Sequence, residues 1–238
     1  MALGLTVELT PPGLVPLRPV LLSCRLIEAV DAQLLGALKL DPARHASFGL
    51  VTCDQDDATY VALDHATKFA DVDVVFAKSF YAGARHASGP FSGEILGILA
   101  GPDPEVVTEG LWALREGLRE SICFHTFAGA GQPAFFAHVI TQTGRYLPPQ
   151  ADLAPGEPMA YLIAPPIESV IGLDAALKAA RVRLARHIPP PSETNFGGAY
   201  LVGELAELEA AAVAFVEAIR AFVAAPLKGS RRPARLRR

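Results

Sequence analysis

Val61-Ala-Leu-Asp-His-Ala-Thr-Lys-Phe-Ala-Asp-Val-Asp-Val74 is matched further along the chain by Ile171-Gly-Leu-Asp-Ala-Ala-Leu-Lys-Ala-Ala-Arg-Val-Arg-Leu184. At this offset of 110 positions the Leu, Asp and Lys that carry the pattern coincide. The paired positions are Leu63/Leu173, Asp64/Asp174, Lys68/Lys178 and Val72/Val182, with Val51/Tyr161 upstream. Downstream we expect an offset of 105, which pairs Gly93/Gly198, Leu96/Leu201, Leu111/Val216, Leu114/Ile219 and Leu118/Val223. A repeat of about 110 residues indicates two duplicated domains rather than a solenoid.

Each repeat is predicted to contain strand, helix, strand, long loop, strand and helix, in that order. Apolar runs rich in β-branched residues predict the strands, and apolar residues at helical spacing predict the helices. In the first repeat the strands are expected at 48–52, 72–76 and 94–99, the helices at 62–69 and 104–119, and the loop at 78–93. In the second repeat the strands are expected at 160–163, 182–186 and 199–202, the helices at 173–180 and 205–223, and the loop at 187–198. Segments 21–38 and 134–147 precede the two repeats and are expected to be equivalent. Strands alternating with helices favour an α/β (α+β) class in which helices cover an open sheet.

The charge is unevenly distributed. The chain of 238 residues has 21 Lys and Arg against 25 Asp and Glu, but residues 228–238 hold six arginines and lysines and no acid. This leaves 15 basic against 25 acidic groups in residues 1–227. An acidic body excludes nucleic-acid binding by the folded part of the chain. The basic tail is expected to be either a disordered solubilising extension or a tether that holds an acidic partner by charge.

Composition also excludes disorder and a membrane span. Hydrophobic residues make up 51% of the chain and charged residues 19%, so we expect a sizeable core. The most apolar long stretch, 205–227, is interrupted by four charged residues, which are costly in hydrocarbon. The N-terminus has no basic region ahead of an apolar segment and therefore predicts no secretory signal. The three cysteines are far apart and are expected to be reduced thiols of a cytosolic protein.

The densest group of acidic residues is Asp54-Gln-Asp56-Asp57. Three carboxylates so close together could hold a metal ion or a cationic ligand, or they could be the solvated turn between Val51 and Tyr60. The two loops 79–90 and 187–198 are long for connections between strands, which favours either a functional loop with two arrangements or a variable surface loop. The histidines show no catalytic spacing, so we expect no nucleophile and no acid or base.

Five stretches resemble the tandem-domain shell proteins of ethanolamine-utilisation bacterial microcompartments. They are Phe48–Tyr60, Ser79–His86, Gly101–Pro104, Pro158–Pro166 and Pro189–Asn195, and the likeness extends in one register from about Cys24 to Pro226. The resemblance implies two circularly permuted microcompartment domains, expected at 1–125 and 126–227, with the tail at 228–238. It also implies a homotrimer that mimics a hexamer and tiles with other shell proteins in the bacterial cytoplasm.

The same resemblance implies the sites. Ethanolamine is expected to contact Asp56, Glu94, Phe124 and Thr194 and to favour a closed state of a central pore. The pore and its gate are expected at Ser79, Tyr81, Gly83, Arg85, His86, Pro190, Glu193 and Asn195. No cofactor is required for this role; ethanolamine is the expected ligand, and cobalamin or adventitious zinc at the pore are further candidates.

Two other functions stay open at this point. One is a tandem-domain shell protein of another compartment, for propanediol or of the carboxysome type, which ethanolamine binding at Asp56 and Glu94 would distinguish. The other is a metal-dependent enzyme that uses Asp54, Asp56 and Asp57.

Overall fold

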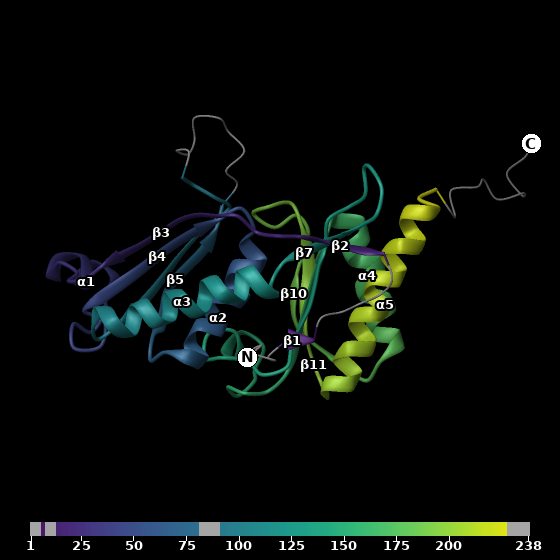
Figure 1. The fold of residues 1–238 in the computed structure, drawn as a ribbon. Coiled ribbons are helices and arrows are strands. Elements are labelled where there is room, and N and C mark those ends of the chain that lie inside the picture. The colour runs from purple at the N-terminus through teal and green to yellow at the C-terminus, as the bar shows by residue number, and fades with distance from the viewer. Residues whose placement is uncertain (1–5, 8–12, 81–90, 228–238) are drawn as a thin grey trace, which may run out of the picture.

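The chain forms two units in a row, each with a sheet and a pair of helices (Figure 1). The computed structural model describes residues 6–7, 13–80 and 91–227. Tyr81, Gly83, Arg85, His86 and the basic tail therefore lie outside the described residues. In the described ranges, no helix is both long enough and apolar enough to cross a membrane.

The first unit is a four-stranded sheet with two long helices on one face and a short helix at its end (Figure 1). Its strands follow the order β3-β4-β6-β5, and every neighbouring pair is antiparallel. The elements are β3 (Leu21–Ile27), α1 (Ala32–Leu38), β4 (Ser47–Cys53), α2 (Asp56–Phe69), β5 (Asp73–Ser79), β6 (Ile95–Gly101) and α3 (Pro104–Glu120).

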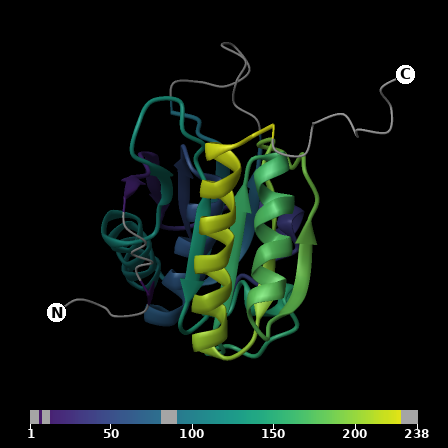
Figure 2. The ribbon, with the colours of Figure 1, turned by 90° about the vertical axis from the view of Figure 1, so that its right-hand side faces the viewer.

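The second unit repeats this plan with a five-stranded antiparallel sheet of order β1-β8-β9-β11-β10. Its elements are β8 (Phe136–Ile140), the 3-10 turn η1 (Pro148–Gln150), β9 (Met159–Ala164), α4 (Pro166–Ala179), β10 (Arg183–Ile188), β11 (Gly197–Val202) and α5 (Leu205–Ala224). The N-terminal β1 (Thr6–Val7) pairs with β8, so the start of the chain belongs to the second sheet. A separate ribbon of β2 (Leu14–Leu17) and β7 (Phe124–Phe127) connects the units. Helices α4 and α5 lie side by side on the outer face of the second sheet (Figure 2).

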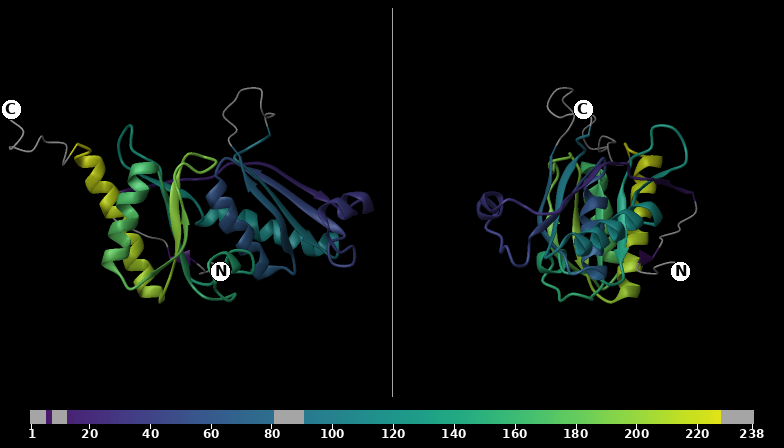
Figure 3. Two further views of the ribbon diagram at one scale, coloured as in Figure 1. Left: turned by 180° about the vertical axis from the view of Figure 1, so that it is seen from behind. Right: turned by 60° about the vertical axis from the view of Figure 1, so that its left-hand side comes forward.

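The layers are therefore sheet, helices, sheet and helices across the molecule (Figure 3). One large apolar cluster joins residues of α2 and α3, such as Leu63 and Leu114, to residues of the second sheet, such as Tyr161 and Tyr200. A second cluster lies between the outer face of that sheet and α4 and α5, with Leu162 and Phe215 at its centre. Because α2 and α3 are packed between two sheets, the units share their main core.

The repeat is confirmed from the first long helix of each unit to the strand that follows it. Helices α2 and α4 begin at Asp56 and Pro166 and end at Phe69 and Ala179, an offset of 110 at both ends. The bulges in β5 and β10, at Val74/Phe76 and Leu184/Arg186, keep the same offset. The predicted offset of 110 therefore holds for α2 and α4 and for β5 and β10. The predicted pair Val51/Tyr161 is wrong by one position, because Val51 faces α2 whereas Tyr161 faces away from α4, and Leu162 is the residue on the helix-covered face.

The predicted downstream offset of 105 is wrong. The residues that cap α3 and α5 are Asp103 and Glu204, an offset of 101, so Leu111 corresponds to Ala212 and not to Val216. The error is one helical turn, because apolar residues four apart on a helix occupy the same face and pair equally well in sequence. The predicted N-cap of α3 is correct, since the Asp103 carboxylate accepts the Val106 N–H at 2.9 Å.

Candidate functional site

The acidic residues after β4 do not form a solvated turn. Asp56 and Asp57 are the first two residues of α2 and are only 7% and 6% exposed. They point in different directions, because Asp56 accepts a hydrogen bond from Thr194 and Asp57 accepts one from Tyr161. Asp54 precedes the helix, and its carboxylate accepts the Val20 N–H at 2.7 Å. In the described part of the chain, no group of three or more His, Cys, Asp or Glu side chains is arranged to hold a metal ion.

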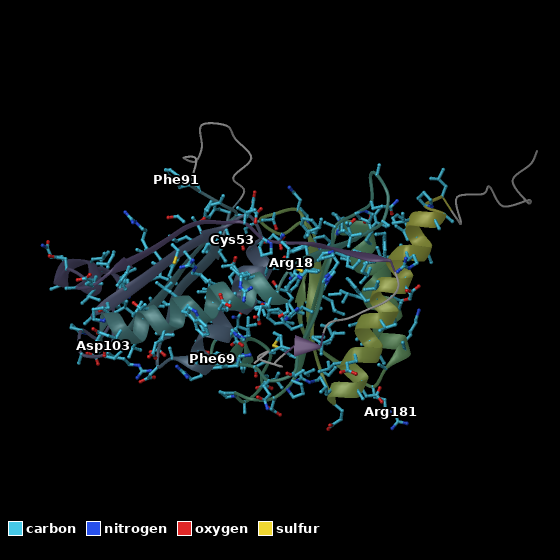
Figure 4. The ribbon with its side chains drawn as sticks, viewed as in Figure 1. Arg18, Cys53, Phe69, Phe91, Asp103 and Arg181 are labelled. Carbon is cyan, nitrogen blue, oxygen red and sulfur yellow. The ribbon has the colours of Figure 1, made fainter. Side chains whose placement is uncertain are left out.

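The four residues expected to bind ethanolamine line one pocket, which we call the acidic pocket. Its volume is about 300 Å³. Among the described residues its lining is Leu17, Asp54, Gln55, Asp56, Glu94, Phe124, Ala134, Thr194 and Phe196. Asp56 and Glu94 come from the first unit, Phe124 from β7 and Thr194 from the turn before β11, so distant parts of the chain meet here. In Figure 4, Cys53, which ends β4 just before this pocket, lies toward the junction of the units, and Asp103 lies at the far end of the first unit.

Backbone contacts fix the position of Glu94. Its N–H donates to the Cys53 carbonyl oxygen at 2.7 Å. The preceding residue, Gly93, donates its N–H to the Thr52 hydroxyl at 2.7 Å and has no room for a side chain, because a Cβ there would lie 1.8 Å from the Cys53 oxygen. Glycine at position 93 therefore lets the chain pass close to β4 and places the Glu94 carboxylate beside Asp56 in the pocket lining.

Gln55 was given no role by the sequence, although it lies between Asp54 and Asp56 in the acidic stretch. Its side chain donates to the Leu17 carbonyl oxygen at 2.7 Å and accepts the Phe124 N–H at 3.1 Å. One glutamine thus joins the connecting β2–β7 ribbon to the start of α2. The partners lie 38 and 69 positions away along the chain, so no local pattern could have identified this contact.

Phe124 and Phe196 form the apolar wall of the acidic pocket. Their ring centroids are 5.7 Å apart in an edge-to-face arrangement. An aromatic wall opposite carboxylates is the arrangement that recognises ammonium ions, because the ring face and the carboxylate both attract positive charge. Phe196 was not among the expected site residues.

Burial raises the pKa of the two carboxyl groups at the start of α2. It raises the pKa of Asp56, although hydrogen bonds from Ser79, the Asp57 N–H and Thr194 oppose the rise. The pKa of Asp57 is raised well above its usual value by burial and by the neighbouring Asp56. Removing these carboxyl groups from water disfavours their charged forms, and an approaching cation would favour them.

The turn that carries Thr194 belongs to the second long loop, where Pro190, Glu193 and Asn195 are expected at the pore. Backbone hydrogen bonds from Ser192 to Phe196 and from Asn195 to Ser192 close the turn, with Asn195 at a φ of 67°. The Thr194 hydroxyl donates to Asp56 at 3.3 Å. On the first loop, Ser79 ends β5 and its hydroxyl pairs with the Tyr60 hydroxyl at 2.8 Å. The described ends of both loops thus contact α2.

Curated relatives of the chain share most of its length. It is 44% identical over 217 residues to the bacterial microcompartment shell protein EutL of Escherichia coli K12, covering 91% of this chain and 99% of that protein. It is also 44% identical over 211 residues to EutL of Clostridium perfringens, covering 89% and 97% of the two chains. No family model matches the chain.

Solved structures agree with these relatives. The crystal structure of EutL from Clostridium perfringens superposes with a TM-score of 0.87 at 43% identity, covering 92% of this chain and 99% of that one. EutL from Leptotrichia buccalis gives a TM-score of 0.85 at 46% identity, covering 90% and 98%. The trimeric shell protein PduB shares the fold alone, with a TM-score of 0.70 at 18% identity, covering 84% and 88%. The relatives are named as shell proteins and not as enzymes. The chain therefore belongs to the EutL family of bacterial microcompartment shell proteins.

Proposed function

We propose that three copies of this chain form a flat ring in the shell of a cytoplasmic ethanolamine-utilisation microcompartment. In this proposal the two long loops gate a central pore, and ethanolamine bound in the acidic pocket favours the closed arrangement. The pore passes substrates, products or bulky cofactors such as cobalamin. The protein itself needs no cofactor for this role and contacts other shell proteins at its edges.

The observation that carries the ligand assignment is the composition of the acidic pocket. Ethanolamine is an ammonium ion near neutral pH, and Asp56 and Glu94 supply carboxylates for it. The Phe124 ring supplies an apolar, electron-rich wall, and the Thr194 hydroxyl supplies a partner for the ligand hydroxyl. A cavity of about 300 Å³ has room for a molecule of this size and for accompanying water.

Contact between the pocket and the second loop supports the gating proposal. Thr194 belongs to the turn 192–196 and donates directly to Asp56, so the turn forms part of the pocket lining. A ligand that needs Thr194 in this position binds more tightly to this loop arrangement than to any other. Such a ligand shifts the population toward that arrangement by its difference in affinity.

Isothermal titration calorimetry with ethanolamine tests the site. We expect Asp56→Asn and Glu94→Gln each to weaken binding by about tenfold or more, since each removes one charge-assisted contact. Glu109→Gln on the exposed face of α3 is the matched control and should bind as the wild type does. Unchanged affinity in both pocket variants would refute the assignment.

The repeat itself supports the ring. Helix α2 is covered by the second sheet of its own chain, and Asp57, Val61 and Thr67 are buried there. Helix α4 is its equivalent, but in one chain no sheet covers its outer face (Figure 2). The positions equivalent to those three residues are Ile167, Ile171 and Leu177, which are 60%, 37% and 38% exposed.

The first sheet offers the complementary surface. In the second sheet the face away from α4 and α5 packs on α2, whereas the corresponding face of the first sheet leaves Phe76 37% exposed. Joining α4 of one chain to the first sheet of the next repeats the contact already made inside the chain. Such a head-to-tail contact forms a closed ring when its rotation closes, and six equivalent units require three chains.

A further inference from the structure

A second cavity lies between the two units and shares Asp56 with the acidic pocket. We call it the tyrosine cavity, because four tyrosines line it: Tyr60, Tyr146, Tyr161 and Tyr200. Its volume is about 200 Å³. The lining comes from α2 and β5 of the first unit and from β9, β10 and β11 of the second, so the packing of the units creates the cavity.

A buried carboxyl group whose hydrogen-bond partner is a tyrosine lies in the wall of this cavity. Asp57 is 6% exposed and accepts a hydrogen bond from the Tyr161 hydroxyl. The charged groups that act on it, Asp56 and Glu193, are both negative and raise its pKa further. A carboxylate in such surroundings is unfavourable unless a proton or another cation compensates it.

One positive group also lines the cavity, but it is already engaged. The Arg186 guanidinium lies 5.6 Å from the centroid of the Tyr200 ring and donates to the Gln150 side chain. With Asp56, Asp57 and Glu193 on the lining against Arg186 alone, the described lining has an excess of acidic groups.

The aromatic rings form corners suited to an apolar cation. Tyr161 and Tyr200 meet edge to face, with ring centroids 4.5 Å apart and planes at 87°. Tyr60 and Tyr146 are nearly parallel, at 19°, with centroids 6.4 Å apart. Tyrosine rings beside a carboxylate recognise substituted ammonium ions, which are poorly hydrated and gain from contact with ring faces.

We propose that the tyrosine cavity is a binding site for a small substituted ammonium ion, held by Asp57 and by the surrounding tyrosine rings. The volume equals that of roughly six or seven water molecules, which suits a ligand of about five to ten heavy atoms. Binding exchanges the ligand for the proton of the Asp57 carboxyl, and that proton is released to the solvent. The site shares Asp56 with the acidic pocket, whereas Glu94, Phe124 and Thr194 line the acidic pocket alone.

Titration calorimetry with tetramethylammonium chloride, at constant ionic strength, tests this site. Tert-butanol is a neutral probe with the same number of heavy atoms. We expect saturable binding of tetramethylammonium and none of tert-butanol. Repeating the titration in two buffers with different heats of ionisation should show proton release on binding.

Variants separate the two cavities. Asp57→Asn should weaken tetramethylammonium binding by about tenfold or more and remove the proton release, while Glu94→Gln should leave both unchanged. Glu193→Gln provides a second test at the edge of the cavity and should weaken binding severalfold. Absence of tetramethylammonium binding, or equal binding by wild type and Asp57→Asn, overturns the proposal. If Glu94→Gln alone abolished tetramethylammonium binding, the ion would be in the acidic pocket instead.

Discussion

Asp64 of α2 and Leu147 of the second unit are joined by a hydrogen bond of 2.8 Å, although they are 83 positions apart. The Asp64 carboxylate also accepts the N–H groups of Gly144 and Tyr146, at 2.6 and 3.0 Å. One side chain therefore satisfies three backbone donors from the segment that follows β8. Arg145 completes the junction by donating to carbonyl oxygens of the first unit, including that of Val72 at 2.9 Å.

Replacing Asp64 tests how strongly this contact holds the units together. Asp64→Ala leaves the three donors without their acceptor, and we expect the free energy of unfolding to fall by about 3 kcal/mol or more. Urea denaturation measures this change. Glu109→Ala, on an exposed helix surface, should change it by less than about 0.5 kcal/mol. A change of similar size in both variants would show that the contact contributes little.

Two buried histidines predict loss of stability in acid. Burial lowers the pKa of His65 to about 4 and that of His138 to about 3, from an ordinary value of 6.5. The folded state therefore favours their neutral forms. The stabilisation that comes from keeping them neutral is complete above pH 6.5 and is lost as the pH falls from 6.5 toward 4 and 3.

The buried carboxyl groups have the opposite effect, because the raised pKa values of Asp56, Asp57 and Asp64 let acid stabilise the fold. The histidine contribution is therefore measured as a difference between two proteins. Between pH 6.5 and 4, the slope of the unfolding free energy against pH should be less positive in His138→Leu than in the wild type, by about 1.4 kcal/mol per pH unit. Parallel curves for wild type and variant would contradict this prediction.

Placing a charge on the outer face of α4 should prevent assembly. Val170 is 56% exposed on this face, and a carboxylate at an apolar contact between chains loses its hydration. We expect Val170→Glu to convert the proposed trimer to a monomer, as measured by light scattering coupled to size exclusion. Val213 of α5 is also exposed, at 42%, and corresponds to Trp112, which stays 56% exposed within the chain. Val213→Glu should therefore remain trimeric, and dissociation of this variant alone would place the interface on α5.

Gly93 should control ligand affinity through Glu94. In Gly93→Ala the added Cβ meets the Cys53 backbone oxygen, so the segment must move and carry the Glu94 carboxylate with it. We expect ethanolamine to bind about tenfold more weakly or worse, with a lower melting temperature. Gly36→Ala in α1 is the control, since a Cβ there meets no atom within 4 Å. It should bind normally and melt at the same temperature or slightly higher.

Local sequence patterns predicted the elements well, because strands and helices follow from nearby residues. The helix 104–119 and its Asp103 cap are examples, with the observed helix ending at Glu120. The start of α2 was placed six residues too late, at Ala62 and not Asp56, because the acidic residues were interpreted as a turn. They are buried only because the second unit covers them, and no pattern within α2 contains that information.

The four residues expected to bind ethanolamine were inferred from the family resemblance and not from spacing. Asp56 and Thr194 are 138 positions apart, and their contact depends on how the two units pack against each other. The same reason explains why Gln55, Phe196 and the tyrosine cavity were not foreseen. Of the expected pore residues, Ser79, Pro190, Glu193 and Asn195 are described, and their role in a pore stays a prediction.

The equivalent helices α2 and α4 begin with residues of different character. The positions that hold Asp56 and Asp57 in α2 hold Pro166 and Ile167 in α4. In a ring of identical single-domain subunits, a carboxylate introduced at this position would weaken every junction at once. Duplication removes that restriction, so one junction can carry polar recognition while the other keeps an apolar surface for cohesion between chains. Any ring built from this chain has half as many acidic pockets as it has domains.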